Sequence, residues 1–263
     1  MTEQILHEAV STEIAEPLGV ITLGDARRRN PLSTSTMRAI IVALRDFDDD
    51  PRVRVIVIRA LGPAFSAGHD LGELVDRTLD DDERAVFATC TELMRTVHEV
   101  RQPVIAEVAG MAFAAGCQLV ATCDLAVAGR SARFSTPGVR IGLFCSTPMV
   151  ALSRAIGRKR AMHMLLTGEP IDAGTAADWG LLSGVVDDDE LSNSVRELAL
   201  HIAGSSARTV SIGKQAFYRQ VELDESAAYD EMGETMATNA MTCDAQEGMS
   251  AFLQKRKPVW TDS

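Results

Sequence analysis

The stretch AGMAFAAGCQLVATCD, residues 109–124, decides the fold of this chain. Its small residues at 114–116 lead into an apolar segment, which predicts a helix running through about Cys123. Residues this small let a ligand approach the backbone closely, and the N–H groups that open a helix stabilise negative charge. The same residues also fit a strand-to-helix turn that is small only for packing. Taken alone, the stretch does not decide between a turn that binds a carbonyl oxygen and a turn that only packs.

Three further stretches favour a binding site. They read AFSAGHDL (64–71), LTGEPIDAGTAADWGLLSGVV (166–186) and EGMSAFLQKRKP (247–258). With AGMAFAAGCQLVATCDLAVAG (109–129), and in this order and spacing, they resemble the enoyl-CoA hydratase/isomerase (crotonase) superfamily over nearly the whole chain. The stretches FSAGHDL (65–71) and PGVRIGLFCSTP (137–148) favour one subgroup of that family. The resemblance implies an α/β fold, a spiral of β-β-α units, followed by a C-terminal helical region that mediates trimerisation.

Composition excludes several classes of protein. The chain has 263 residues, enough for a large buried core, and its net charge of −11 argues against nucleic acid as a partner, because phosphate binding needs clustered Lys and Arg. It has no apolar run long enough for a membrane span. Five cysteines without a C-x-x-C pair fit a reducing compartment, and residues 1–17 lack the basic start or Arg-rich pattern of a targeting peptide. We therefore expect a cytoplasmic protein.

Apolar patterns predict strands that alternate with helices. Buried parallel strands are expected at 20–23, 53–58, 104–108 and 125–128, where apolar residues run almost unbroken. Two helices are expected between them, one capped by Ser33 and running to about Phe47, the other over 83–100. Their inward faces would carry Met37, Ile40, Ile41 and Leu44 in the first helix, and Val86, Cys90, Leu93, Met94 and Val97 in the second. This alternation predicts βαβ units.

The pattern changes after residue 186. DDDEL (187–191) opens a helix in which Leu191, Val195, Leu198 and Ile202 share one face. Further helices are expected at about 205–220, 224–240 and 242–256, with no strand pattern among them. We therefore predict a spiral core over residues 1–200 and a C-terminal helical region over 201–263.

The family resemblance also implies a site. It places two backbone N–H donors, which would form an oxyanion hole for a thioester carbonyl, at Ala67 and Ala115. It places the two glutamates of the family's hydratases at Gln118 and Gly138. An amide cannot move a proton near neutral pH, and glycine has no side chain at all, so we expect efficient hydration to be lost.

Contacts with a CoA thioester are expected from residues on both turns and beyond: Arg27, Ala67, Gly68, His69, Asp70, Leu71, Cys145 and Lys255. Arg27 matches a position where the family often binds the nucleotide part of CoA, and Lys255 is expected to reach a CoA in a neighbouring subunit. Three roles stay open. His69 is either a replacement base or a histidine bonded to loop backbone, Asp70 a base or a helix cap, and Cys145 a nucleophile or a buried inert thiol.

These observations predict an acyl-CoA-binding enzyme, a lyase or isomerase of fatty-acid or acyl-CoA metabolism that stabilises a thioester enolate. The alternative is a non-catalytic acyl-CoA-binding or scaffolding protein of the same fold. A homotrimer or a dimer of trimers is expected. The chain has no dinucleotide or P-loop motif, and its histidines show no metal-ligand spacing. We therefore expect no metal and no cofactor, with the coenzyme A thioester as substrate.

Overall fold

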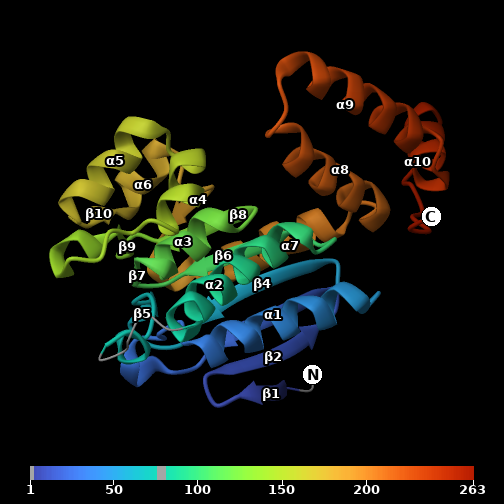
Figure 1. The fold of residues 1–263 in the computed structure, drawn as a ribbon. Helices are drawn as coiled ribbons and strands as arrows, with labels where there is room; N and C mark the ends of the chain where they lie inside the picture. The colour runs from blue at the N-terminus through green and yellow to red at the C-terminus, as the bar shows by residue number, and fades with distance from the viewer. Residues whose placement is uncertain (1–2, 76–80) are drawn as a thin grey trace.

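Two β-sheets form the centre of the fold in the computed structural model, which describes residues 3–75 and 81–263 (Figure 1). The larger sheet has the strand order β1-β2-β3-β4-β6-β8-β11. Its strands are β1 (Glu3–His7), β2 (Val10–Ala15), β3 (Leu18–Leu23), β4 (Val55–Ala60), β6 (Val104–Val108), β8 (Leu125–Gly129) and β11 (Gly184–Val186). The smaller sheet has the order β10-β9-β7-β5. Its strands are β5 (Ala64–Ser66), β7 (Met111–Phe113), β9 (Arg133–Ser135) and β10 (Ile171–Asp172).

Successive strands alternate between the two sheets. β4, β6 and β8 lie in the larger sheet, and each is followed by a strand of the smaller one, β5, β7 and β9. An α-helix closes each repeat: α2 (Asp81–Glu99) follows β5 and a 3₁₀ turn, α3 (Ala115–Thr122) follows β7 directly, and α4 (Pro148–Ala155) follows β9 and another 3₁₀ turn. Pairing is parallel from β3 to β11 and from β5 to β9. This arrangement confirms the expected spiral of β-β-α units.

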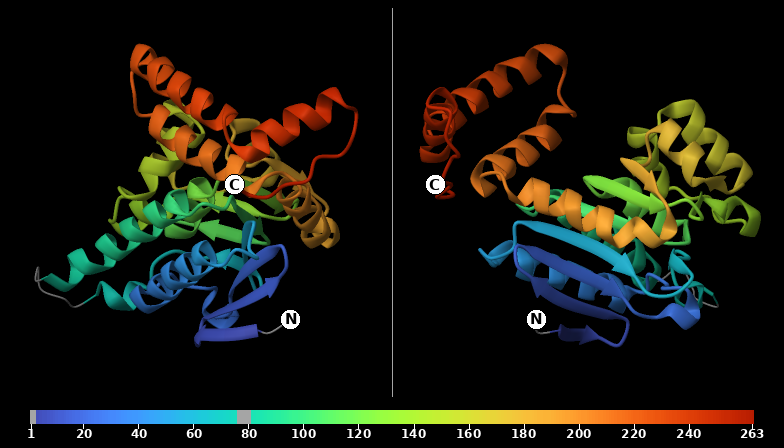
Figure 2. Two further views of the ribbon diagram at one scale, coloured as in Figure 1. Left: turned by 90° about the vertical axis from the view of Figure 1, so that its right-hand side faces the viewer. Right: turned by 180° about the vertical axis from the view of Figure 1, so that it is seen from behind.

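The central strand β4 shows why its sequence is apolar on both faces. Ile56 and Ile58 pack into the main core beneath α1 (Thr34–Asp49) and α2, whereas Val55 and Val57 face α7 (Leu191–Ala203) on the other side. Side chains alternate across a strand, so a sheet covered on both faces needs apolar residues at every position. Figure 2 shows α7 lying across the face of the sheet opposite to α1.

The predicted helices form where their patterns placed them. Ser33 caps α1 through its side chain, which accepts a hydrogen bond from the Thr36 N–H at 3.1 Å. The inward residues expected on the first two helices are buried: Met37, Ile40, Ile41, Leu44, Val86, Cys90, Leu93, Met94 and Val97. Patterns two or three residues long escape periodicity analysis, so the strands of the smaller sheet were not predicted. Neither were α5 (Arg158–Thr167) and α6 (Ala173–Trp179).

The C-terminal helices form an arm. α8 (Ala207–Gln220) lies against α2, while α9 (Glu225–Ala240) and α10 (Cys243–Leu253) extend away from the sheets (Figures 1 and 2). Lys214 fixes α8 to the core: its buried ammonium donates to the carbonyls of Val97 and Gln102 and pairs with Asp124, each at 2.8 Å. The helices expected after residue 186 are therefore confirmed. The division at residues 200 and 201 stays a prediction.

Candidate active site

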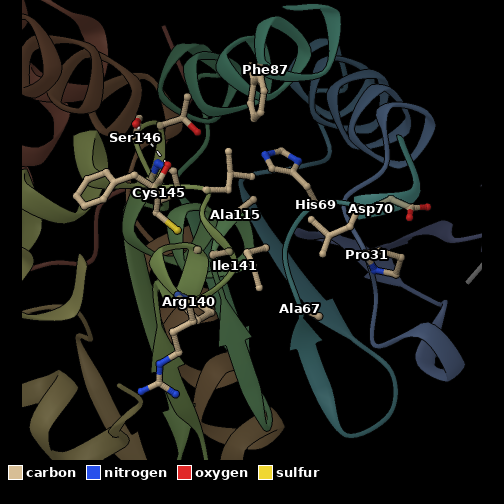
Figure 3. A pocket seen from close by; sticks show the side chains of 18 of the residues that line it. Pro31, Ala67, His69, Asp70, Phe87, Ala115, Arg140, Ile141, Cys145 and Ser146 are labelled. Carbon is tan, nitrogen blue, oxygen red and sulfur yellow. Dashed lines mark hydrogen bonds between the residues drawn. The ribbon is translucent and has the colours of Figure 1, made fainter. Parts of the chain in front are cut away.

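A cavity of about 710 Å³ lies between the turns after β5 and β7 and the loop after β9. Figure 3 shows it from close by, with Ala67, His69 and Asp70 on one side and Ile141, Cys145 and Ser146 on the other. Aliphatic and aromatic side chains make up much of its wall: Pro31, Leu71, Phe87, Pro137, Ile141, Leu143, Phe144 and Pro148. A largely apolar hollow with few polar groups is the usual form of a small-molecule site.

The turn after β5 forms one wall of the cavity. Gly68 adopts φ +105°, a conformation that favours glycine. A Cβ at this position would lie 2.9 Å from the Cβ of Ala114 and 3.2 Å from the carbonyl oxygen of Phe113. The small residues of AFSAGHDL therefore let this turn pack directly on the turn after β7.

The turn after β7 forms the adjoining wall and opens α3. Ala114 adopts φ 48° and ψ −117°, which is strained for a residue with a side chain, and α3 begins at Ala115. Gly116 sits against β5, since a Cβ there would lie 2.5 Å from the carbonyl oxygen of Ser66. The small-residue run therefore packs closely and also brings the N-terminus of α3 to the cavity, while its binding of a carbonyl oxygen stays a prediction.

The backbone N–H groups of these turns differ in availability. The Ala67 N–H donates to the Arg29 carbonyl at 2.9 Å, so the structure does not support the prediction that Ala67 donates to a ligand. The N–H groups of His69 and Ala115 have no acceptor among the residues that the structure describes, and both residues line the cavity. On this turn it is therefore the His69 N–H, two residues beyond Ala67, that is available to a ligand, and not the Ala67 N–H.

Gln118 lies one turn into α3 and is buried, but it does not line the cavity. Its amide oxygen accepts a hydrogen bond from the Cys90 thiol of α2 at 3.6 Å. Burial raises the pKa of Cys90 to about 12, so that thiol is protonated and can donate. The side chain at the first glutamate position is thus held by the core.

Gly138 lines the cavity opposite the turns and leaves no room for a side chain. A Cβ on this residue would lie 2.0 Å from the carbonyl oxygen of Leu143 and 2.8 Å from the sulfur of Cys145. Burial also raises the pKa of the Cys145 thiol, which favours the inert form over a thiolate nucleophile. The loop side of the cavity therefore carries no acid at the second glutamate position.

Asp70 and Arg28 form an ion pair at the mouth of the cavity. The Arg28 guanidinium lies 2.6 Å from the Asp70 carboxylate, and this hydrogen bond lowers the pKa of Asp70. Asp70 also accepts from the Gly72 N–H at 3.1 Å and so caps the short 3₁₀ turn Leu71–Glu73, as its cap interpretation predicted. Arg28 was not among the predicted contacts. The run of three arginines at 27–29 was the signal for it, but the sequence does not say which arginine turns inward.

His69 is bonded to loop backbone, as one of its two interpretations predicted, and its role as a base stays a prediction. Its Nδ1 lies 3.3 Å from the Leu32 carbonyl oxygen, and its Nε2 is buried without a hydrogen-bond partner among the described residues. Its ring meets the Phe87 ring edge to face, with centroids 5.6 Å apart. Burial lowers the pKa of the imidazole below its ordinary value, which favours the neutral ring.

The cavity unites most of the predicted contacts. Ala67, His69, Asp70, Leu71 and Cys145 line it, whereas Arg27, Gly68 and Lys255 do not. Arg27 and Lys255 are exposed, and their predicted CoA contacts stay predictions. Among the described residues, no group of three His, Cys, Asp or Glu side chains is arranged to hold a metal ion. No described helix is both long enough and apolar enough to span a membrane.

Comparisons with known proteins identify the family. The enoyl-CoA hydratase/isomerase family model matches residues 13–263. Enoyl-CoA hydratase domain-containing protein 3, mitochondrial, from Danio rerio is 46% identical over 92% of this chain and 84% of its own length. The crystal structure of the human enoyl-CoA hydratase domain-containing protein 3 superposes with a TM-score of 0.94 at 45% identity, covering 96% of this chain and all of that one. An enoyl-CoA hydratase structure from Mycobacterium smegmatis also gives a TM-score of 0.94, at 43% identity, covering 97% and 99%.

These relatives confirm the subgroup indicated by FSAGHDL and PGVRIGLFCSTP, which is that of enoyl-CoA hydratase domain-containing protein 3. They also correct one expectation. The vertebrate relatives are mitochondrial proteins by name, which contradicts the prediction of a cytoplasmic protein. By its motifs, its spiral of β-β-α units and these matches, the chain belongs to the enoyl-CoA hydratase/isomerase (crotonase) family.

Proposed function

We propose that the protein binds acyl-CoA thioesters in the cavity and stabilises the thioester enolate with the backbone N–H groups of His69 and Ala115. One observation carries this proposal. Two N–H groups that have no acceptor among the described residues stand on two turns that pack against each other at the cavity. A carbonyl oxygen that gains negative charge needs donors of this kind, and the N-terminus of α3 adds its positive end to the same place.

The reaction class follows from what the site lacks. Hydration of an enoyl thioester needs a base for water and an acid for the α-carbon, and Gln118 and Gly138 supply neither. We therefore place the protein among lyases or isomerases that act through an enolate in acyl-CoA or fatty-acid metabolism, with efficient hydratase activity excluded from the proposal. The missing carboxylates also favour a second candidate, a non-catalytic acyl-CoA-binding or scaffolding protein.

The polyanionic part of CoA requires cations near the mouth of the cavity. Arg28 lines the cavity and is exposed, so it is the cation best placed for this contact, with Arg27 beside it in the sequence. Lys255 follows α10, and we propose that it serves a CoA held by a neighbouring subunit. These contacts would bind the ligand without any metal or further cofactor.

The arm supports the proposal of a trimer or a dimer of trimers. Phe252 is 82% exposed and Leu253 81% exposed, and large apolar side chains also stand exposed on α8 and α9: Phe217, Tyr229 and Met236. A soluble protein rarely leaves so many apolar side chains on one projecting element uncovered. Light scattering at micromolar concentration should report a trimer or hexamer, and a monomer would contradict the proposal.

Calorimetry with three ligands tests the proposed function. Butyryl-CoA should bind at micromolar to millimolar concentration, and NAD should not bind. The S-butyl thioether of CoA has the same chain but no carbonyl oxygen, so it should bind about tenfold or more weakly, since two hydrogen bonds of about 1 kcal/mol each are lost. Absence of heat with butyryl-CoA would overturn acyl-CoA binding. Equal affinity for thioester and thioether would remove the oxyanion hole from the proposal.

A further inference from the structure

An enolate forms only if some group takes a proton from the α-carbon, and the two glutamate positions cannot do so. Gln118 is an amide turned toward Cys90, and Gly138 has no room for a side chain. The base must then be another residue that lines the cavity. Of the lining residues that the structure describes, the titratable ones are Arg28, His69, Asp70, Arg140 and Cys145.

Four of these residues are poorly suited to accept a proton. An arginine stays protonated in proteins, which removes Arg28 and Arg140. Figure 3 also shows the Arg140 guanidinium pointing away from His69 and Ala115. Asp70 is held by Arg28 at 2.6 Å and by the Gly72 N–H at 3.1 Å, and both bonds favour its ionised form over its protonated form. Cys145 is a buried thiol, and a protonated thiol has no basic lone pair to offer.

His69 has a nitrogen in the state that a base needs. A carbonyl oxygen only accepts hydrogen bonds, so the contact between Nδ1 and the Leu32 carbonyl places the ring proton on Nδ1. Nε2 then carries a free lone pair, on the edge of the ring away from Leu32. It is buried and has no partner among the described residues. Figure 3 shows the ring between Phe87 and Ala115, on the cavity side of its turn.

We propose that His69 is the base that removes a proton from the α-carbon of a bound acyl-CoA thioester, an inference that rests on the acyl-CoA binding proposed above. The Nε2 lone pair takes the proton, and the electron pair of the C–H bond becomes the double bond of the enolate. The carbonyl π pair moves onto the oxygen, which accepts from the N–H groups of Ala115 and of His69 itself. One residue thus supplies a donor from its backbone and a base from its side chain.

The proton taken by Nε2 has two destinations. Its return to the α-carbon restores the thioester and exchanges hydrogen with solvent when the imidazolium proton is replaced. Its delivery to the γ-carbon of a 3-enoyl thioester shifts the double bond and gives the 2-enoyl thioester. Both outcomes balance without an oxidant, a reductant or added water. The substrate class inferred for this site is therefore acyl-CoA thioesters that carry an α-proton.

The experiment follows the α-protons of butyryl-CoA in D₂O by proton NMR, with calorimetry on the same samples. The native protein should exchange these protons. His69→Gln keeps the backbone N–H and a polar side chain but removes the base, so exchange should fall by about 10² or more while butyryl-CoA affinity changes only a few-fold. His201→Gln is the matched control, because His201 is an exposed histidine of α7 outside the cavity, and its exchange rate should equal that of the native protein.

A second variant distinguishes the loss of the base from a loss of structure. His69→Ala leaves space in the cavity wall, and added imidazole should restore exchange to a protein that still binds butyryl-CoA. Native-rate exchange in His69→Gln, or a native protein that binds butyryl-CoA without exchanging its α-protons, would overturn the inference and leave the proposed binding intact. If the native protein binds no thioester, the proposed function itself fails, and calorimetry shows this before any exchange is measured.

Discussion

The two sides of the cavity present different chemical groups. The turn side, residues 66–69 and 114–116, presents backbone N–H groups at the start of a helix. The loop side, around Gly138 and Cys145, presents no carboxylate. A backbone donor survives every substitution except proline, whereas an acid is lost by a single exchange. Under the proposed function, the turn side would stabilise negative charge, while the loop side supplies no carboxylate to move protons.

The largest effect is expected from removing a donor on the turn side. Ala115 is the first residue of α3, a position where proline is tolerated because its missing N–H has no partner within the helix. Ala115→Pro should slow α-proton exchange of butyryl-CoA by about 10²–10³, roughly 2.7–4 kcal/mol. Exchange is measured by NMR in D₂O with protein whose fold is checked by circular dichroism.

Ala115→Gly is the matched control for that variant. It changes the same side chain but keeps the N–H group, so its exchange rate should stay within a few-fold of the native rate. Equal losses in the proline and glycine variants would show that packing at residue 115, and not the donor, matters to the site.

Adding a side chain at Gly138, on the loop side of the cavity, should destabilise the protein. Gly138→Ala places a methyl group against the Leu143 carbonyl oxygen, where a Cβ would be 2.0 Å away, and should lower the free energy of unfolding by about 1–3 kcal/mol. Urea denaturation measures the loss. Gly213→Ala is the control, because a Cβ there meets nothing within 4 Å on α8, and it should stabilise the protein by up to about 1 kcal/mol. A neutral Gly138→Ala would mean that the loop yields easily and that an acid fits at residue 138.

An acid at the other glutamate position should affect stability more than hydration. Gln118→Glu puts a carboxyl group into a buried position beside Cys90, which raises its pKa above that in the unfolded chain. The variant should match the native protein near pH 4 and become less stable as pH rises. The total loss of unfolding free energy should be about 1.4 kcal/mol for each unit by which folding raises the pKa of the introduced carboxyl group. Denaturation at pH 4, 6 and 8 measures this. Crotonyl-CoA hydration should stay slow in both proteins, and a large gain in the variant would show that residue 118 reaches the substrate.

The smallest effect concerns strain on the turn side. Ala114 adopts φ 48° and ψ −117°, which glycine occupies more easily, so Ala114→Gly should raise the free energy of unfolding by up to about 1 kcal/mol. Ala121→Gly within α3 should instead cost about 1 kcal/mol. Thermal denaturation compares the two. If both variants lose stability equally, the backbone at Ala114 stores no strain.

The expectations that succeeded rest on local patterns. The strand at 104–108 and the helix capped by Ser33 lie where an apolar run and a capping residue placed them, because periodicity and capping act within a few residues. Strands such as β10, with two residues, exist only because β9 pairs with them. Gly138 lines the cavity, and only the tertiary structure shows that a side chain there has no room, because the atom that fills the space belongs to Leu143.

The sequence by itself determined the family, the strands β3, β4, β6 and β8, and the helices α1, α2, α3 and α7 to α10, since these depend on which residues occur and how they are spaced. The tertiary structure alone decided which groups are free to act. The Ala67 N–H is occupied because the Arg29 carbonyl meets it, and Arg28 is the inward cation because Asp70 lies 42 residues further along the chain beside it. His69 Nε2 has no partner within residues 3–75 and 81–263, because Leu32 contacts the other ring nitrogen. Such pairings join segments distant in sequence, and no local pattern records them.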